Sequence, residues 1–188
     1  MKLQTTSRLV AILFVVSSVP SLTISQSISS RTYRMGSVGN LEMAVLSHWQ
    51  EVVKTLDKPN GVTLAYRLPS RTDFYMNVTA VWIGPEGRAS RKAGWVRRAV
   101  EESARSVAGY SKTLPKLTPI FSPGGNGYYF QSPGYDRLPI GEFHYITEGI
   151  VDFGEVTFVF TIYSNTQDLS EIADALRVIE SARFAAKT

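Results

Sequence analysis

Five cationic side chains are the most conspicuous chemical feature of the sequence: Arg88, Arg91, Lys92, Arg97 and Arg98. They fall within eleven consecutive residues that contain no acid. A helical pattern begins near residue 90, so the cluster lies at a helix start, where positive charge opposes the helix dipole. Because helix stability does not favour this arrangement, we interpret the cluster as a contact surface for an anionic partner. The alternative is a solvated helix face.

A second feature is the segment SPGGNGYYFQSPGYDRLPIGEFHY, residues 122–145. Gly125 and Gly127 form G-x-G, but Phe130 occupies the third glycine position of a dinucleotide-binding loop, and no Lys-Ser/Thr pair follows. The stretch that follows has a strand pattern rather than a helical one, which excludes a phosphate-binding loop. A turn between strands explains the glycines. Three tyrosines are candidate partner contacts, with burial in the core as the alternative: Tyr128, Tyr129 and Tyr135.

His144 is one of only two histidines in the chain. Glu142 and Glu148 stand two residues before it and four after it, which places the three side chains on one face of a strand. His144 and Glu142 are therefore candidates for a metal site, and a solvent-facing histidine is the simpler interpretation. We expect no cofactor.

Motifs for nucleophilic catalysis are absent from the sequence. It contains no cysteine, no G-x-S-x-G and no S-x-x-K; Ser111, for example, has Leu114 at the lysine position. The carboxylates of Glu101 and Glu102 fall on the predicted helix and are expected to be solvated. We therefore expect no enzymatic activity and assign no catalytic residue, with a cryptic hydrolase as an alternative.

The first residues, MKLQTTSRLVAILFVVSSVPSLTISQS, have the layout of a secretory signal peptide. A positively charged start precedes the apolar run Leu9–Val16, which is too short to span a bilayer because that requires about 20 residues. We assign residues 1–25 to the signal peptide, with Ser21 and Ser27 as alternative last residues. Since no cysteine is available for lipidation, we expect a periplasmic or secreted protein without a stable membrane anchor.

The charge balance argues against nucleic acid as a partner. The chain has 20 Lys and Arg against 16 Asp and Glu, and without Lys2 and Arg8 the ratio is 18 to 16, a net charge of +2.

Because an exported chain without disulfides must be stabilised by its core, the size of the mature part matters. About 160 residues are sufficient, since a domain of ~150 residues buries about 68–70% of its unfolded surface.

Hydrophobic periodicity predicts one domain over residues 39–188 after a flexible Ser-rich arm at residues 26–38. Alternating runs predict strands in NLEMAVLSHW, VTLAYRL, DFYMNVTAVWI, GYYFQ, EFHYITEGI and EVTFVFTIYS. Helical spacing predicts one helix from Ser90 to near Gly109 and a second that begins with a capping box at Asp168 and Glu171. Consecutive strands favour antiparallel pairing, so we expect an α+β fold: a mainly antiparallel sheet of about six strands flanked by helices.

This order of elements resembles the PsbP-like superfamily, which includes the DcrB-like exported proteins of bacteria. The resemblance rests on LEMAVLSHW, on the hairpin VTLAYRLPSRTDFYMNVTAVWI, on the run from YYFQSPGYDRLP to EVTFVFTIYS, and on LSEIADALRVIESARF. It covers residues 40–184. It implies an α/β/α sandwich and an accessory or binding role without catalysis. The family has no invariant catalytic set to transfer, and the lack of cysteine departs from its lipoprotein members.

The sequence therefore predicts an exported, non-enzymatic accessory or binding protein. Its expected partner is an unknown protein or an anionic component of the cell envelope, such as phospholipid headgroups or lipopolysaccharide. The alternative is a periplasmic protein that binds a small ligand or a metal.

Overall fold

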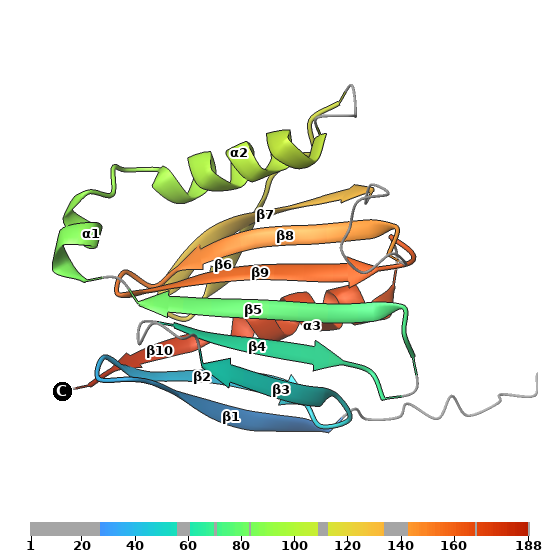
Figure 1. The fold of residues 1–188 in the computed structure, drawn as a ribbon, viewed down its shortest axis with the longest axis horizontal. Coiled ribbons are helices and arrows are strands. Elements are labelled where there is room, and N and C mark those ends of the chain that lie inside the picture. The colour runs from blue at the N-terminus through green and yellow to red at the C-terminus, as the bar shows by residue number, and fades with distance from the viewer. Residues whose placement is uncertain are drawn as a thin grey trace, which may run out of the picture.

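The computed structural model describes residues 27–55, 61–69, 71–82, 84–108, 113–133, 143–167 and 169–187. The predicted signal peptide lies outside the described residues, as do Tyr135, Glu142 and Asp168. Figure 1 shows a layered body of strands with helices on both sides of the larger sheet.

The described residues form ten strands in two antiparallel sheets. The strands are β1 (Ile28–Met35), β2 (Gly39–Leu46), β3 (Gln50–Thr55), β4 (Gly61–Arg67), β5 (Phe74–Trp82), β6 (Thr118–Ser122), β7 (Gly125–Pro133), β8 (Tyr145–Asp152), β9 (Val156–Ser164) and β10 (Arg183–Ala186). The seven-stranded sheet has the order β3-β4-β5-β9-β8-β7-β6, and the three-stranded sheet has the order β1-β2-β10. The helices are α1 (Pro85–Ala89), α2 (Trp95–Ala108) and α3 (Ser170–Ser181).

The centre of the larger sheet follows from the alternation of β5 and β9, where every second residue from Phe74 to Ala80 and from Val156 to Ile162 is apolar and buried. Phe74, Met76 and Val78 point to the same side as Phe158 and Phe160 of the neighbouring strand, and all five are at most 1% exposed. Burying a side chain of this size contributes about 1.5–3 kcal/mol relative to leaving it exposed. This face forms the main core, together with the small sheet and α3.

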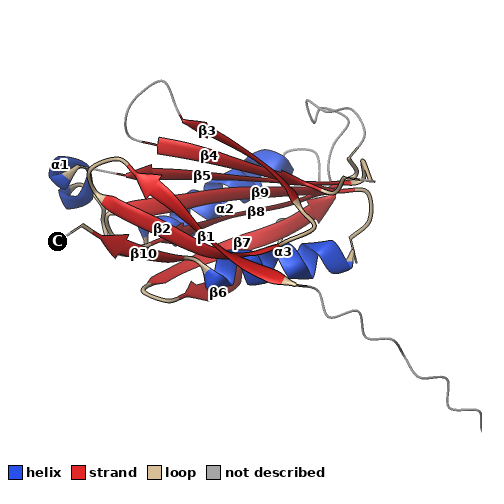
Figure 2. Ribbon diagram, turned by 90° about the horizontal axis from the view of Figure 1, so that it is seen from below, coloured by secondary structure: helices blue, strands red, loops and turns tan. Residues whose placement is uncertain are grey.

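The two faces of the larger sheet have different covers. On the core face lie α3 and the small sheet, which are side by side in Figure 2. On the opposite face α2 packs on β7 and β8 through a second cluster that includes Val96, Val100 and Phe130. The described residues place no helix on this face over β3, β4 and β5 (Figure 1). We call this uncovered part the open face.

The structure differs from the prediction at the N-terminal arm. Residues 28–35 form strand β1 and pair with β2 along their whole length, so the flexible arm predicted for residues 26–38 is wrong over this stretch. Tyr33 and Met35 are buried in the main core, whereas the residues of β1 before Tyr33 are largely exposed and, apart from Ile28, polar. The apolar alternation is therefore too short to be detected without the partner strand.

Two further differences concern strand number and helix ends. The mainly antiparallel α+β fold is confirmed, but the described part of the chain has ten strands in two sheets rather than about six in one. Helix α3 begins one residue later than the capping box predicts, after the N-cap residue Leu169, which makes no side-chain cap hydrogen bond; Asp168 of the predicted capping box lies outside the described residues. Glu171 accepts a hydrogen bond from Arg71.

Candidate functional site

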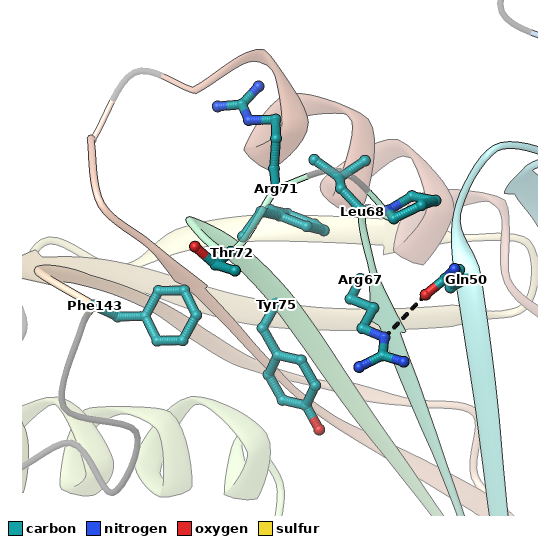
Figure 3. A pocket seen from close by; sticks show the side chains of 9 residues that line it. Gln50, Arg67, Leu68, Arg71, Thr72, Tyr75 and Phe143 are labelled. Carbon is teal, nitrogen blue, oxygen red and sulfur yellow. Dashed lines mark hydrogen bonds between the residues drawn. The ribbon is translucent and has the colours of Figure 1, made fainter.

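A cavity of about 590 Å³ lies where β4 leads into β5, at the edge of the open face. Nine residues line it: Gln50, Arg67, Leu68, Pro69, Arg71, Thr72, Phe74, Tyr75 and Phe143. Its volume falls within the roughly 300–1,000 Å³ that is typical of small-molecule sites. In Figure 3 the ring of Tyr75 lies between Phe143 and the guanidinium of Arg67.

The sheet register explains how these side chains meet. Gln50 pairs with Arg67, Arg67 with Tyr75, and Tyr75 with Tyr163, so one row crosses the four adjacent strands β3, β4, β5 and β9. Directly opposite residues of antiparallel strands have Cβ atoms about 4.5–5.5 Å apart and project to the same face. The row is therefore a consequence of backbone pairing and needs no loop to hold it.

Three aromatic rings form one side of this row. The ring centroids of Tyr75 and Tyr163 are 6.0 Å apart with planes tilted by 31°, and those of Phe143 and Tyr163 are 5.6 Å apart with a tilt of 35°. These separations are typical of favourable offset contacts. Burial raises the pKa of Tyr163, and the negative charge of Glu148 and the nearby Tyr75 raise it further. The phenol of Tyr163 is therefore neutral around pH 7.

The polar side of the cavity contains two arginines in different environments. The Nε atom of Arg67 donates a hydrogen bond to the side-chain oxygen of Gln50 at 3.1 Å. Arg71 instead donates to Asp73 at 2.9 and 2.5 Å and to Glu171 at 2.5 Å. The hydrogen bonds from Arg71 hold the pKa of the Asp73 carboxyl below its usual range. Arg71 is thus neutralised by its neighbours, and it links the β4–β5 connection to α3.

A smaller hollow of about 160 Å³ adjoins the cavity. It is lined by Val52, Lys54, Ala65, Tyr66, Arg67 and Tyr75. Arg67 and Tyr75 line both hollows. These two side chains therefore separate the cavity from the hollow that reaches Lys54 on β3.

The structure places Arg91, a member of the predicted cationic cluster, in an internal network. Its guanidinium donates to Asp152 at 2.9 Å and to Thr157 at 2.6 Å, and it lies 3.9 Å from the centroid of the Trp95 ring. Trp95 in turn donates its indole N–H to Asp152 at 3.1 Å. The Arg91 side chain is only 15% exposed. This arrangement ties the segment before α2 to β8 and β9.

The remaining cluster members divide into paired and unpaired groups. Arg88 forms an ion pair with Glu155 at 2.8 Å, and Arg97 forms one with Glu101 at 2.9 Å. Lys92 and Arg98 are exposed, and no carboxylate of the described residues pairs with them; Arg98 donates only to backbone carbonyl oxygens. The cationic surface is therefore partly neutralised, and its role in partner binding remains a prediction.

The two described tyrosines of the candidate contact set point in opposite directions. Tyr128 packs against the cluster beneath α2, with the guanidinium of Arg97 at 6.0 Å from its ring centroid, whereas Tyr129 packs against the main core. Both are half-buried. Adjacent residues of a strand alternate between faces, so these two rings do not form one surface. Tyr135 lies outside the described residues.

The glycine-rich stretch forms a hairpin turn, as predicted. Strands β6 and β7 pair antiparallel on either side of Gly124, whose φ of +79° suits glycine. Gly127 has a different function, because a Cβ there would lie 1.9 Å from the carbonyl oxygen of Ile150 on β8. It allows the backbones of β7 and β8 to approach closely.

Of the two candidate metal ligands, the structure describes only His144, so the predicted pair remains untested. His144 is exposed, and Glu142 lies outside the described residues. Glu148 accepts a hydrogen bond from the hydroxyl of Ser103 at 2.5 Å. Within the described ranges, no group of three or more acidic or histidine side chains is placed to hold a metal ion. None of the helices formed by these residues has both the length and the apolar character needed to cross a membrane.

The cavity residues were not predicted as a site, although the sequence contains a signal for part of it. The alternation of VTLAYRL and DFYMNVTAVWI places Arg67 and Tyr75 on the face opposite the core. The predicted hairpin of these runs brings the two residues opposite each other if the register is known. Gln50 and Phe143 lie outside these two runs, and no local sequence pattern indicates that they meet Arg67 and Tyr75 in the folded chain.

Comparisons with known proteins identify the fold. No protein-family model matches the sequence, and no curated protein is significantly similar to it. The solution structure of cyanobacterial PsbP (CyanoP) from Synechocystis sp. PCC 6803 is 13% identical with a TM-score of 0.52, over 90% of this chain and 99% of that one. A crystal structure from Bacteroides thetaiotaomicron VPI-5482 is 14% identical with a TM-score of 0.45, over 77% of this chain; the matched region spans only 45% of that protein. The likeness to CyanoP, together with the antiparallel sheets and flanking helices, shows that this chain has a PsbP-like fold.

Proposed function

We propose that this protein is an exported, non-enzymatic binding protein that holds a small organic ligand in the cavity between Tyr75, Phe143 and Arg67. The observation that supports this function is the cross-strand row on the open face, which presents aromatic rings and a guanidinium to one cavity. The site combines apolar walls with a few polar groups, as small-molecule sites generally do. Rigid strands position these groups before a ligand arrives, which limits the entropy lost on binding.

Two fluorescent probes test this function. N-phenyl-1-naphthylamine is neutral, and 8-anilino-1-naphthalenesulfonate has the same aromatic skeleton with a sulfonate. We expect at least one of them to bind the purified protein saturably with a one-to-one stoichiometry. Y75A is expected to weaken that binding about tenfold, because one aromatic wall is removed.

The control for this experiment is V159A. Val159 is 36% exposed on β9 and does not line the cavity, so its truncation should leave probe affinity unchanged. Thermal melting of both variants verifies that the fold is retained. If neither probe binds in a Tyr75-dependent manner, the cavity is not a ligand site and the proposed function is wrong.

A second candidate function is contact with an anionic component of the cell envelope. Lys92 and Arg98 favour it, because both are exposed at the start of α2 and have no carboxylate partner among the described residues. Sedimentation with vesicles that contain phosphatidylglycerol tests this surface directly. The double variant K92Q/R98Q should reduce binding at low salt, and equal binding of wild type and variant would exclude this surface.

A further inference from the structure

We infer that the ligand of the cavity is an amphipathic anion: an aromatic or similarly flat apolar group that carries one oxyanion, such as a carboxylate, sulfonate or phosphate. This inference rests on the proposed function of the same site and adds the chemical class of the ligand. Its basis is the contrast between Arg67 and the other charged groups around the cavity.

Within the described ranges, most of the hydrogen-bonding capacity of the Arg67 guanidinium is unused. Its Nε atom donates to Gln50, whereas its two terminal nitrogens have no acceptor among the described residues. A guanidinium has five N–H donors in a planar fork, and the terminal nitrogens match the geometry of an oxyanion. The bond to Gln50, drawn as the dashed line in Figure 3, orients the fork.

Among the described residues that line the two hollows, none carries a negative charge that would neutralise the Arg67 guanidinium. None of the nine residues around the larger cavity is acidic, and none of the six around the adjoining hollow is. On β3, Glu51 pairs with Tyr66 of the core-facing row and accepts a hydrogen bond from Tyr33, so it lies on the opposite face of the sheet. Lys54, at the far end of the adjoining hollow, adds a second positive charge.

Arg71 provides an internal comparison, because it lines the same cavity with both of its carboxylate partners in place. Asp73 and Glu171 compensate its charge. An incoming anion therefore gains less at Arg71 than at Arg67. Because the charge of Arg67 is less compensated than that of Arg71, we expect the oxyanion to bind at the β3–β4 side of the cavity.

The apolar part of the ligand has a defined place next to this charge. Tyr75 lies between Arg67 and Phe143 (Figure 3), and Tyr163 on β9 packs against the rings of both Tyr75 and Phe143. A flat apolar group against Tyr75 would lie within reach of the Arg67 fork, because the two residues are direct cross-strand neighbours. Neither a purely polar anion nor a neutral aromatic molecule would use both parts of the site.

The matched probes introduced above separate this inference from the proposed function. We expect the sulfonate probe to bind about tenfold more tightly than the neutral amine, since a charge-assisted contact to a positioned arginine contributes about that factor. R67Q should remove this preference, so that the two probes bind with similar affinity, and R67K should retain part of it. Raising the salt concentration should weaken binding of the sulfonate probe only.

R105Q is the matched charge control. Arg105 is 61% exposed on α2 and lies outside the cavity lining, so this variant removes one positive charge without altering the site. It should leave the preference for the sulfonate probe intact. Competition by 1-naphthoate and by 1-naphthyl phosphate then identifies the preferred oxyanion. If the neutral probe binds in a Tyr75-dependent manner but the sulfonate probe binds no more tightly, or if R67Q keeps the preference, the anion inference is wrong and the cavity remains a ligand site.

Discussion

Replacing Arg91 with glutamine should destabilise the folded protein, although the sequence marks this residue as a candidate partner contact. In the structure its guanidinium joins Asp152, Thr157 and Trp95, which come from three separate segments. Its side chain is 15% exposed and that of Asp152 is 19% exposed. The substitution would therefore leave a largely buried carboxylate without its cation.

The expected loss follows from the individual contacts. A hydrogen bond to a charged group contributes about 1.5–3 kcal/mol, and a cation–π contact contributes about 0.5–1 kcal/mol or more when shielded from water. These terms are not additive, because Asp152 keeps its hydrogen bond from Trp95. We expect a net loss of about 2–4 kcal/mol, which lowers the melting temperature by roughly 5–15 °C for a domain of this size.

Equilibrium urea unfolding followed by fluorescence measures this loss, with R105Q as the control. Arg105 approaches Glu101 at 3.7 Å on the exposed side of α2, so its substitution should change the free energy of unfolding by less than about 0.5 kcal/mol. A double-mutant cycle of R91Q with D152N should show a coupling of about 1–3 kcal/mol. Stabilities of R91Q and R105Q that agree within about 0.5 kcal/mol would refute the structural function of Arg91.

Two further predictions concern the core. G127A should destabilise the protein by roughly 2–4 kcal/mol in urea unfolding, because its Cβ would lie 1.9 Å from the carbonyl oxygen of Ile150; G84A, which has open space around it, should be nearly neutral, and equal effects of the two would contradict this prediction. Burial raises the pKa of Tyr66, and its 2.8 Å hydrogen bond with the Tyr33 hydroxyl raises it further. The folded state thus retains this proton while an unfolded tyrosine loses it near pH 10, so stability is intact below about pH 10 and falls as the pH rises above it. Y66F should lose about 1 kcal/mol at pH 8 and show a shallower decline from pH 9 to 11; an unchanged slope would show that Tyr66 does not cause the decline.

Local periodicity was sufficient to predict the central sheet. The alternation of Phe74, Met76 and Val78, and of Phe158 and Phe160, identified the strands and the buried face, and both are confirmed. This succeeded because a strand that buries one face imposes a period of two on its own residues, whatever its partners. The turn at Gly124 was likewise predictable, since positive φ is a property of one residue.

Helix positions were only partly determined by the same local reasoning. Helical spacing placed Trp95, Ala99, Val100, Ser103 and Val107 on one stripe of this helix; Val100 is buried as predicted, but the other buried residues are Val96, Ala104 and Ala108. Trp95 is half-buried, and its indole N–H donates to Asp152 on β8. This partner is distant along the chain, so local periodicity gives no sign of it.

By itself, then, the sequence determined the α+β class, the central strands and their inner faces, because these depend on residues that are neighbours along the chain. Only the tertiary structure decided that residues 28–35 form a strand, that Arg91 has an internal carboxylate partner, and that Gln50, Arg67, Tyr75 and Tyr163 form one row. Each of these depends on the register between segments that are distant in sequence. A shift of one residue in that register would turn the affected side chains to the other face, and no local pattern records which register the folded chain adopts.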